Sequence, residues 1–124
     1  MTIRVLVADD QAMIRGALAG LLDLESDIEV VAQASDGARA LEELARLAAA
    51  GGPARASAPV DVAIIDVEMP RMDGITATQA IRSRFPGVRV LIVTTFGRPG
   101  YLQRALDAGA TGFMVKDAPV ETLA

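Results

Sequence analysis

The stretch Val60–Gly74, VDVAIIDVEMPRMDG, decides the fold class of this chain of 124 residues. Its first part, VDVAIID, consists mainly of aliphatic and β-branched residues, which is typical of a strand buried on both faces. The part that follows Asp66 contains Pro70 and closes on Asp73–Gly74, a signal for a turn and the start of a helix. A buried strand that leads through a loop into a helix is the repeating unit of a parallel α/β sheet.

The same unit recurs on both sides of this stretch. The other expected strands are Ile3–Asp9, Ile28–Ala34, Val88–Thr95 and Gly112–Lys116. The expected helices are Ala12–Leu24, one that opens at Asp36–Gly37, Ile75–Phe85, one that ends near Ala108 with Pro99 in its first turn, and one that starts within Pro119–Ala124. These alternations predict an α/β fold of the flavodoxin-like (βα)5 type, with a parallel five-stranded sheet in the order 2-1-3-4-5 and right-handed crossovers.

Two segments stand outside this pattern. Ala48–Pro59, AAAGGPARASAP, has no periodicity and predicts a long, flexible and catalytically neutral connection at the amino-terminal edge of the sheet. In the first helix, Met13, Ala17 and Leu24 lie at helical spacing. Ordinary core packing is the preferred interpretation of these three residues, and an exposed apolar patch that mediates pairing of two chains is the alternative.

The composition excludes several kinds of chemistry. The chain has no His, Cys or Trp, and Lys116 is its only lysine. A histidine-based triad, a thiol nucleophile, a disulfide and the usual zinc, haem or iron–sulfur ligands are therefore ruled out. The net charge of −4 argues against DNA binding by this segment. Because no signal peptide and no apolar stretch of about 18 residues occurs, we expect a cytoplasmic protein with no membrane partner.

Polar groups collect where the buried strands end. The first strand ends at Asp9–Asp10, the third at Asp66, the fourth at Thr94–Thr95 and the fifth at Lys116. Because the carboxyl ends of parallel strands meet at one edge of a sheet, we expect these side chains to converge. Taken singly, each has a simpler interpretation: Asp10 as a helix cap or a residue just before the helix, Thr94 as a strand former and Lys116 as a solvated charge.

Three neighbouring carboxylates repel one another unless a cation lies between them. Oxygen ligands of this kind favour Mg²⁺. A carboxylate can also attack phosphorus to give an aspartyl phosphate, a reaction that needs charge neutralisation more than proton transfer. Lys116 would supply a second positive charge and the Thr94 hydroxyl a hydrogen-bond donor, so the absence of His is no obstacle.

The chain resembles the receiver (CheY-like) domain of bacterial two-component response regulators over essentially its whole length. The segments that carry the resemblance are VLVADD (Val5–Asp10), IIDVEMPRMDG (Ile64–Gly74), LIVTT (Leu91–Thr95) and GFMVKD (Gly112–Asp117). The strings DQAMIRGALAGLL and TTFGRPGYLQRALDAGATGFMVKDAP are similar to the NarL/FixJ subfamily, which carries a LuxR-type helix-turn-helix output domain. Within it, the second string is similar to regulators of membrane-lipid desaturation.

The resemblance implies a role for each acidic residue at the expected edge. Asp66 is the implied phosphoacceptor. Asp9 and Asp10 are implied to hold Mg²⁺, directly or through water, together with Asp66. The residue two positions after the acceptor, Glu68, would contribute its backbone carbonyl, so its side chain need not matter. Pro70 and Gly74 are implied to shape the loop after the acceptor.

Three further residues are implied to respond to phosphorylation. Thr94 corresponds to the switch hydroxyl and Lys116 to the phosphate-binding lysine. Phe113 occupies the position of the family's switch aromatic, and a plain core aromatic is its alternative interpretation.

The resemblance also implies the partners. A sensor histidine kinase would donate the phosphoryl group, which cannot come from a chain without His. The phosphorylated domain would change conformation and form a homodimer that controls a DNA-binding output domain in transcription regulation. It would not be a conventional enzyme, although autophosphatase activity is compatible with it. We expect residues 1–124 to be a receiver domain whose last helix is truncated and whose output domain is absent from this chain.

Other functions remain open from the sequence. A stand-alone phosphorelay receiver has the same motifs. A phosphatase of the haloacid dehalogenase type also uses an aspartate nucleophile, but its D-x-D motif is replaced here by Asp66-Val67-Glu68 and no cap segment occurs. A flavodoxin is disfavoured because no Ser/Thr/Gly-rich phosphate loop follows the first strand.

Overall fold

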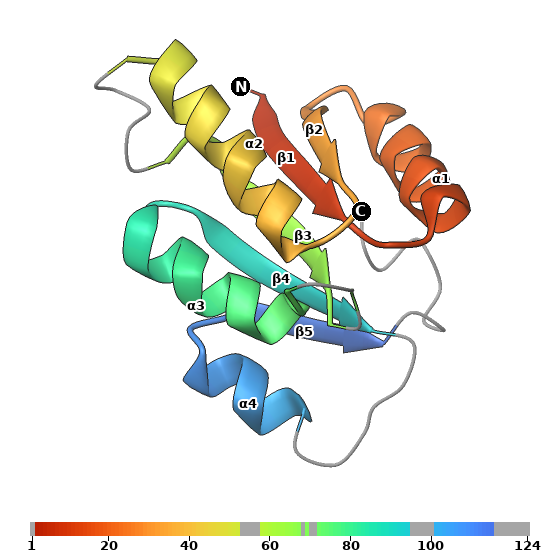
Figure 1. The fold of residues 1–124 in the computed structure, drawn as a ribbon. Helices are drawn as coiled ribbons and strands as arrows, with labels where there is room; N and C mark the ends of the chain where they lie inside the picture. The colour runs from red at the N-terminus through yellow and green to blue at the C-terminus, as the bar shows by residue number, and fades with distance from the viewer. Residues whose placement is uncertain (1, 53–57, 68, 70–71, 95–100, 116–124) are drawn as a thin grey trace.

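A five-stranded parallel sheet with helices on both faces forms the molecule (Figure 1). The computed structural model describes residues 2–52, 58–67, 69, 72–94 and 101–115. Its strands are β1 (Ile3–Ala8), β2 (Ile28–Ala34), β3 (Val62–Asp66), β4 (Arg89–Thr94) and β5 (Gly112–Val115). Its helices are α1 (Ala12–Asp23), α2 (Gly37–Ala50), α3 (Gly74–Arg84) and α4 (Tyr101–Asp107).

The predicted sheet order is confirmed, since the strands lie in the order β2-β1-β3-β4-β5. Every neighbouring pair is parallel, with Val5 of β1 opposite Val30 on one side and Val62 on the other. Asp66 is paired with Val93, so the ends of β3 and β4 lie at the same level of the sheet. Strand and helix limits that fall within the described residues agree with the predicted ones to within two residues, which is the usual uncertainty at element ends.

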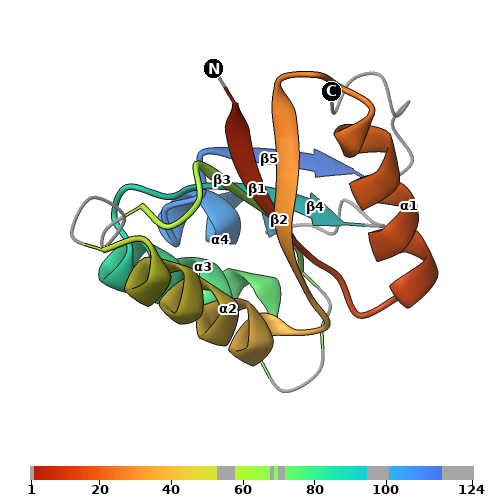
Figure 2. The same ribbon diagram turned by 90° about the horizontal axis from the view of Figure 1, so that it is seen from above.

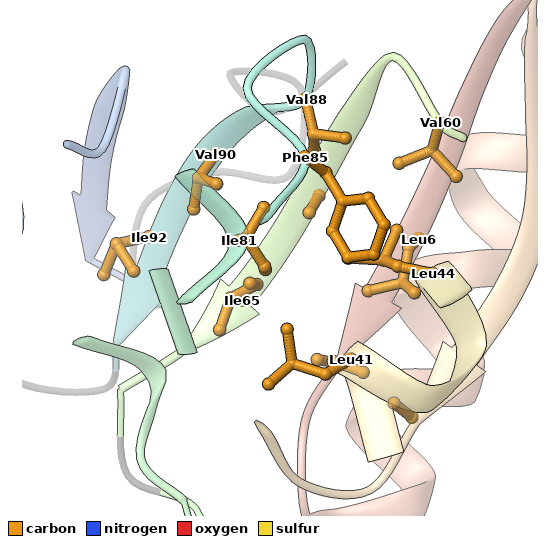
Figure 3. Packing of buried hydrophobic residues seen from close by; sticks show 14 of the residues in the cluster. Leu6, Leu41, Leu44, Val60, Ile65, Ile81, Phe85, Val88, Val90 and Ile92 are labelled. Carbon is orange, nitrogen blue, oxygen red and sulfur yellow. The ribbon is translucent and has the colours of Figure 1, made fainter. Parts of the chain in front are cut away.

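Helices α2 and α3 cover one face of the sheet, and α1 lies against the opposite face (Figure 2). The face under α2 and α3 holds the larger hydrophobic cluster. Figure 3 shows its centre, where the Phe85 ring lies among side chains from the sheet and both helices. Its fully buried members include Leu6, Leu44, Val60, Ile65, Ile81, Val88, Val90 and Ile92. This face supplies most of the apolar burial that holds the fold together.

The face under α1 has a smaller cluster, and much of α1 stays in solvent. Only Ala19 and Leu22 of α1 are buried. Met13 is 86% exposed, Leu24 is 79% exposed and Ala17 is also exposed. The preferred interpretation of these three residues as core is therefore wrong, since all three are exposed; that they mediate pairing of two chains stays a prediction.

The helix starts follow local capping chemistry. The Asp36 carboxylate accepts a hydrogen bond from the Arg39 amide at 2.8 Å, and the Asp73 carboxylate accepts one from the Thr76 amide at 2.8 Å. Asp10 precedes α1 without capping it, because Gln11 occupies the N-cap position and makes no side-chain cap hydrogen bond. Its side chain is thereby left available at the edge of the sheet.

The remaining expectations have mixed outcomes. Helix α2 continues to Ala50, so the start of the expected Ala48–Pro59 loop is helical because its alanines favour helix. The rest of that connection leads to Asp61, whose amide donates to the Arg4 carbonyl at 2.9 Å, at the amino-terminal edge as predicted. Pro99 and the helix expected within Pro119–Ala124 lie outside the described residues. Among the described helices, none combines the length and the apolar character needed to cross a membrane.

Candidate functional site: an acidic cluster at the carboxyl edge

Three carboxylates converge where β1 and β3 end. One carboxylate oxygen from each of Asp9, Asp10 and Asp66 lies within 4.8 Å of the other two. Asp9 and Asp66 are buried, with 3% and 5% of their surface exposed, whereas Asp10 is exposed. The convergence predicted from the strand ends is therefore present for these three residues.

Hydrogen bonds of its backbone amide, its backbone carbonyl and its side chain fix Asp9 in position. Its amide donates to the Ala34 carbonyl at 3.0 Å and extends the pairing of β1 with β2 by one residue. Its Oδ1 atom accepts from the Gln11 amide at 2.9 Å, and its carbonyl accepts from Nη1 of Arg15 at 2.6 Å. These bonds hold the Asp9 side chain against the start of α1 and set its direction toward Asp66.

Asp66 is held by a close approach of the helix that follows its loop. The Gly74 amide donates to the Val67 carbonyl at 2.9 Å. A Cβ atom at Gly74 would lie 2.0 Å from the Asp66 carbonyl oxygen, so only glycine fits at this position. The expectation that Gly74 shapes the loop after Asp66 gains a physical basis from this contact.

A second glycine ties the same loop to α2. The Gly37 amide donates to the Met72 carbonyl at 3.1 Å. A Cβ atom at Gly37 would lie 2.6 Å from that carbonyl oxygen and 3.0 Å from the Cβ of Ala77. The loop between Asp66 and α3 is therefore clamped at its far end by the first residue of α2.

The donor set of the cluster fits a hard divalent cation. Mg²⁺ is bound through oxygen atoms, usually a few carboxylates together with waters. Three carboxylate oxygens within 4.8 Å of one another supply such a donor set, and waters would complete it.

The other predicted site residues are only partly described. Thr94 is the last residue of β4 and pairs with Val115, one position beyond the level of Asp66. Phe113 lies in β5 opposite Ile92. Lys116 and Glu68 lie outside the described residues. The roles predicted for these four residues stay predictions.

An apolar groove of about 250 Å³ runs from the acidic cluster along the sheet beside α1. Its lining residues are Val7, Ala8, Asp9, Ile14, Ala17, Leu18, Leu21, Ile64, Asp66 and Val93. Because the groove carries both buried carboxylates, the acidic cluster opens onto the less covered face of the sheet.

Sequence reasoning missed three of these contacts. The pairs Asp36–Gly37 and Asp73–Gly74 predict helix starts. They do not show that the glycine of each pair lies against a backbone carbonyl, that of Met72 for Gly37 and that of Asp66 for Gly74. The sequence indicates the hydrogen bond from Arg15 to the Asp9 carbonyl only weakly, through the presence of a cation one turn into the helix that follows the acidic pair. Each contact joins segments distant in sequence or depends on a side-chain conformation.

The chain matches the family model described as the response regulator receiver domain over residues 5–124. It is 39% identical over 122 residues to the transcriptional regulatory protein DesR from Bacillus subtilis, covering 98% of this chain and 55% of that protein. Its fold is similar to that of the signal receiver domain of the putative response regulator NarL from Mycobacterium tuberculosis, with a TM-score of 0.82, 36% identity and coverage of 97% and 88% of the two chains.

A DNA-binding response regulator of the LuxR family from Staphylococcus aureus is also similar, with a TM-score of 0.83, 30% identity and coverage of 98% and 92%. The resemblance inferred from the motifs is confirmed by these matches. The chain spans about half the length of the curated relatives it matches.

Proposed function

Since this chain belongs to the response regulator receiver domain family, we propose that Asp66 accepts a phosphoryl group from a sensor histidine kinase. The convergence of the Asp9, Asp10 and Asp66 carboxylates at one edge carries this proposal. In the reaction, a carboxylate oxygen of Asp66 forms a bond to phosphorus, and the bond between phosphorus and the donor imidazole nitrogen breaks. The imidazole leaves with the electron pair of that bond, and the product is an aspartyl phosphate.

The chain's own residues prepare the acceptor for this step. The close contact with Gly74 fixes the backbone of Asp66, and the backbone of Asp9 is fixed by its bonds to Ala34 and Arg15. Burial of both carboxylates orients them and limits competition from water. Exposed Asp10 completes the cluster on its solvent side.

Asp9, Asp10 and Asp66 are the residues that would hold Mg²⁺, with the Glu68 carbonyl as a further ligand. The ion would neutralise the charge on the carboxylates and on the transferred phosphoryl oxygens. We assign Lys116 as the cation that pairs with the phosphate and Thr94 as the hydroxyl that donates to it.

Phosphorylation is proposed to act by changing the surface near β4 and β5. A phosphate adds charge beside the carboxyl end of β4, where Thr94 lies, and Phe113 on β5 is the proposed aromatic partner of that change. The output is proposed to be homodimerisation that controls a DNA-binding domain beyond residues 1–124. This domain division is supported by relatives that are about twice as long and are described as transcriptional regulatory proteins.

Incubation with acetyl phosphate and Mg²⁺, followed by intact-mass measurement, tests the acceptor. We expect the gain of one phosphoryl group, its loss on treatment with hydroxylamine, which cleaves acyl phosphates, and no gain in Asp66→Asn. Asp107→Asn is the matched control, because Asp107 is an exposed residue at the end of α4 and an asparagine oxygen keeps its bond from Gln103.

An equal phosphoryl gain in Asp66→Asn, or none in the parent chain, contradicts the proposal. Continuous hydrolysis of a phosphate ester with no dependence on a separate donor protein would favour the phosphatase alternative instead.

A further inference from the structure

A second hollow, polar in character, is lined by residues of α1, the end of β2 and α2. It has a volume of about 230 Å³ and is lined by Arg15 of α1, by Gln33, Ala34 and Ser35 at the end of β2, and by Arg39 and Glu43 of α2. Because Ala34 accepts the hydrogen bond from the Asp9 amide, this polar hollow adjoins the acidic cluster. Among its side chains only that of Arg15 has a role described above, through its hydrogen bond to the Asp9 carbonyl.

Among the described residues, neither arginine of the polar hollow forms an ion pair with a carboxylate. Nη1 of Arg15 donates instead to the backbone carbonyl of Asp9 at 2.6 Å, a bond that fixes the guanidinium. The Arg39 backbone amide donates a hydrogen bond to the Asp36 carboxylate. The Arg39 guanidinium makes no ion pair within the described part of the chain. Two positive charges therefore face one hollow on a chain of net charge −4.

The acidic residue in the lining, Glu43, is already engaged. Its carboxylate accepts hydrogen bonds from Nη2 and Nε of Arg46 at 2.9 and 3.3 Å. The hydrogen bond from Arg46 lowers the pKa of Glu43, and the nearby charge of Arg39 acts in the same direction. The carboxylate of Glu43 is thus paired with Arg46, which does not line the hollow, so two arginines and one engaged carboxylate line it.

We propose that the polar hollow is a binding site for an oxyanion, held between the guanidinium groups of Arg15 and Arg39. A guanidinium offers several N–H donors in a planar fork that matches the oxygens of a phosphate or a carboxylate. The half-buried Ser35 hydroxyl supplies a further donor at the end of β2. A free phosphate and a carboxylate of an acidic peptide share this chemistry, and either would bind beside the acidic cluster without occupying it.

Titration of the ¹⁵N-labelled chain with inorganic phosphate, without Mg²⁺ and at constant ionic strength, tests the proposal. We expect saturable shifts of the Ser35 and Arg39 amide resonances in the wild-type chain. Arg39→Gln, which removes the charge and keeps a polar side chain of similar reach, is expected to weaken binding by about tenfold. Arg89→Gln is the matched control, because Arg89 is exposed at the start of β4 on the opposite edge and should bind phosphate like the wild type.

A parallel titration with a triglutamate peptide separates the two sources of the oxyanion. Tighter binding of the peptide than of phosphate supports a carboxylate of a protein partner, and binding of phosphate alone supports a small free oxyanion. The proposal is overturned if neither ligand shifts these two resonances, or if Arg39→Gln and Arg89→Gln bind both ligands like the wild type. Since the measurement needs neither Mg²⁺ nor phosphoryl transfer, its failure would leave the acceptor role of Asp66 unaffected.

Discussion

Within the part of the chain that the structure describes, the two faces of the sheet differ in how completely helices cover them. Under α2 and α3, side chains such as Leu44 and Ile81 are fully buried, and the Phe85 ring fills the centre (Figure 3). Under α1, the cluster is smaller, an apolar groove reaches the acidic cluster, and Met13 is 86% exposed. The covered face therefore carries the stability of the domain, while the open face is the one on which the acidic cluster can be reached.

This difference has a consequence for function. The strands between the two faces are shared, so Asp9 and Asp66 are anchored from the covered side and open toward the other. A change at the acidic cluster can alter the open face without disrupting the main core. Substitutions on the covered side and on the open side should therefore differ in their effect on stability.

The largest expected difference is between two leucines. Leu44→Ala removes a fully buried side chain from α2 and should lower the free energy of unfolding by about 2–5 kcal/mol. Leu21→Ala on α1, where the side chain is 43% exposed, should cost less than about 1 kcal/mol. Urea denaturation of the two variants measures both values, and equal losses would contradict the division into a covered and an open face.

Replacement of two helical glycines by alanine should change the stability of the fold in opposite directions. Gly37→Ala on α2 places a Cβ atom 2.6 Å from the Met72 carbonyl oxygen, so the loop must shift, at a cost of about 1–3 kcal/mol. Gly20→Ala on α1 meets nothing within 4 Å and should stabilise the helix by up to about 1 kcal/mol. Thermal unfolding monitored by circular dichroism gives the sign of each effect, and destabilisation by both would show that α1 is more tightly packed than described.

A moderate effect is expected inside α3. The Thr78 hydroxyl is buried and donates to the Gly74 carbonyl at 2.7 Å, next to the acceptor loop. Thr78→Val keeps the shape and removes this bond, so we expect a loss of about 1 kcal/mol. Thr76→Val on the exposed side of the same helix is the control and should stay within about 0.5 kcal/mol of wild type. No difference between the variants in urea would mean that the hydroxyl does not stabilise this helix.

The smallest effect is expected on the outer surface of α2. The hydrogen bond from Arg46 lowers the pKa of Glu43 in the folded chain, so the pair stabilises the fold above the unfolded-state pKa of Glu43. That contribution is lost as the pH falls through the lower folded-state pKa. Glu43→Gln should therefore reduce the urea midpoint slightly at neutral pH and leave it unchanged in acid, where Glu43 is protonated. A larger effect in acid than at neutral pH would contradict this assignment.

Local chemistry made much of the fold predictable from the sequence. Capping residues such as Asp36 and Asp73 set where helices begin, and aliphatic runs set the buried strands. The flavodoxin-like order, chosen as the best topology for five strands in a chain of this size, predicted the sheet order and with it the meeting of Asp9 and Asp66 at one edge.

What remained unpredictable depends on how much of a helix is covered. The exposure of Met13 and Leu24 does not follow from their helical spacing, because a stripe of apolar residues is the same whether or not another element covers it. Contacts between distant loops, such as that of Gly37 with Met72, depend on the final packing distance of two helices. The orientation of the Arg15 guanidinium depends on its side-chain conformation, which a helical pattern does not fix.

Titration with Mg²⁺, measured by isothermal calorimetry, tests most directly whether Asp9, Asp10 and Asp66 act as one cation site. We predict one site in the wild-type chain and a loss of affinity of at least about tenfold in both Asp9→Asn and Asp66→Asn. Asp107→Asn should bind Mg²⁺ like the wild type. Unchanged affinity in Asp9→Asn and Asp66→Asn, or an equal loss in Asp107→Asn, would contradict the assignment of the acidic cluster as the functional site.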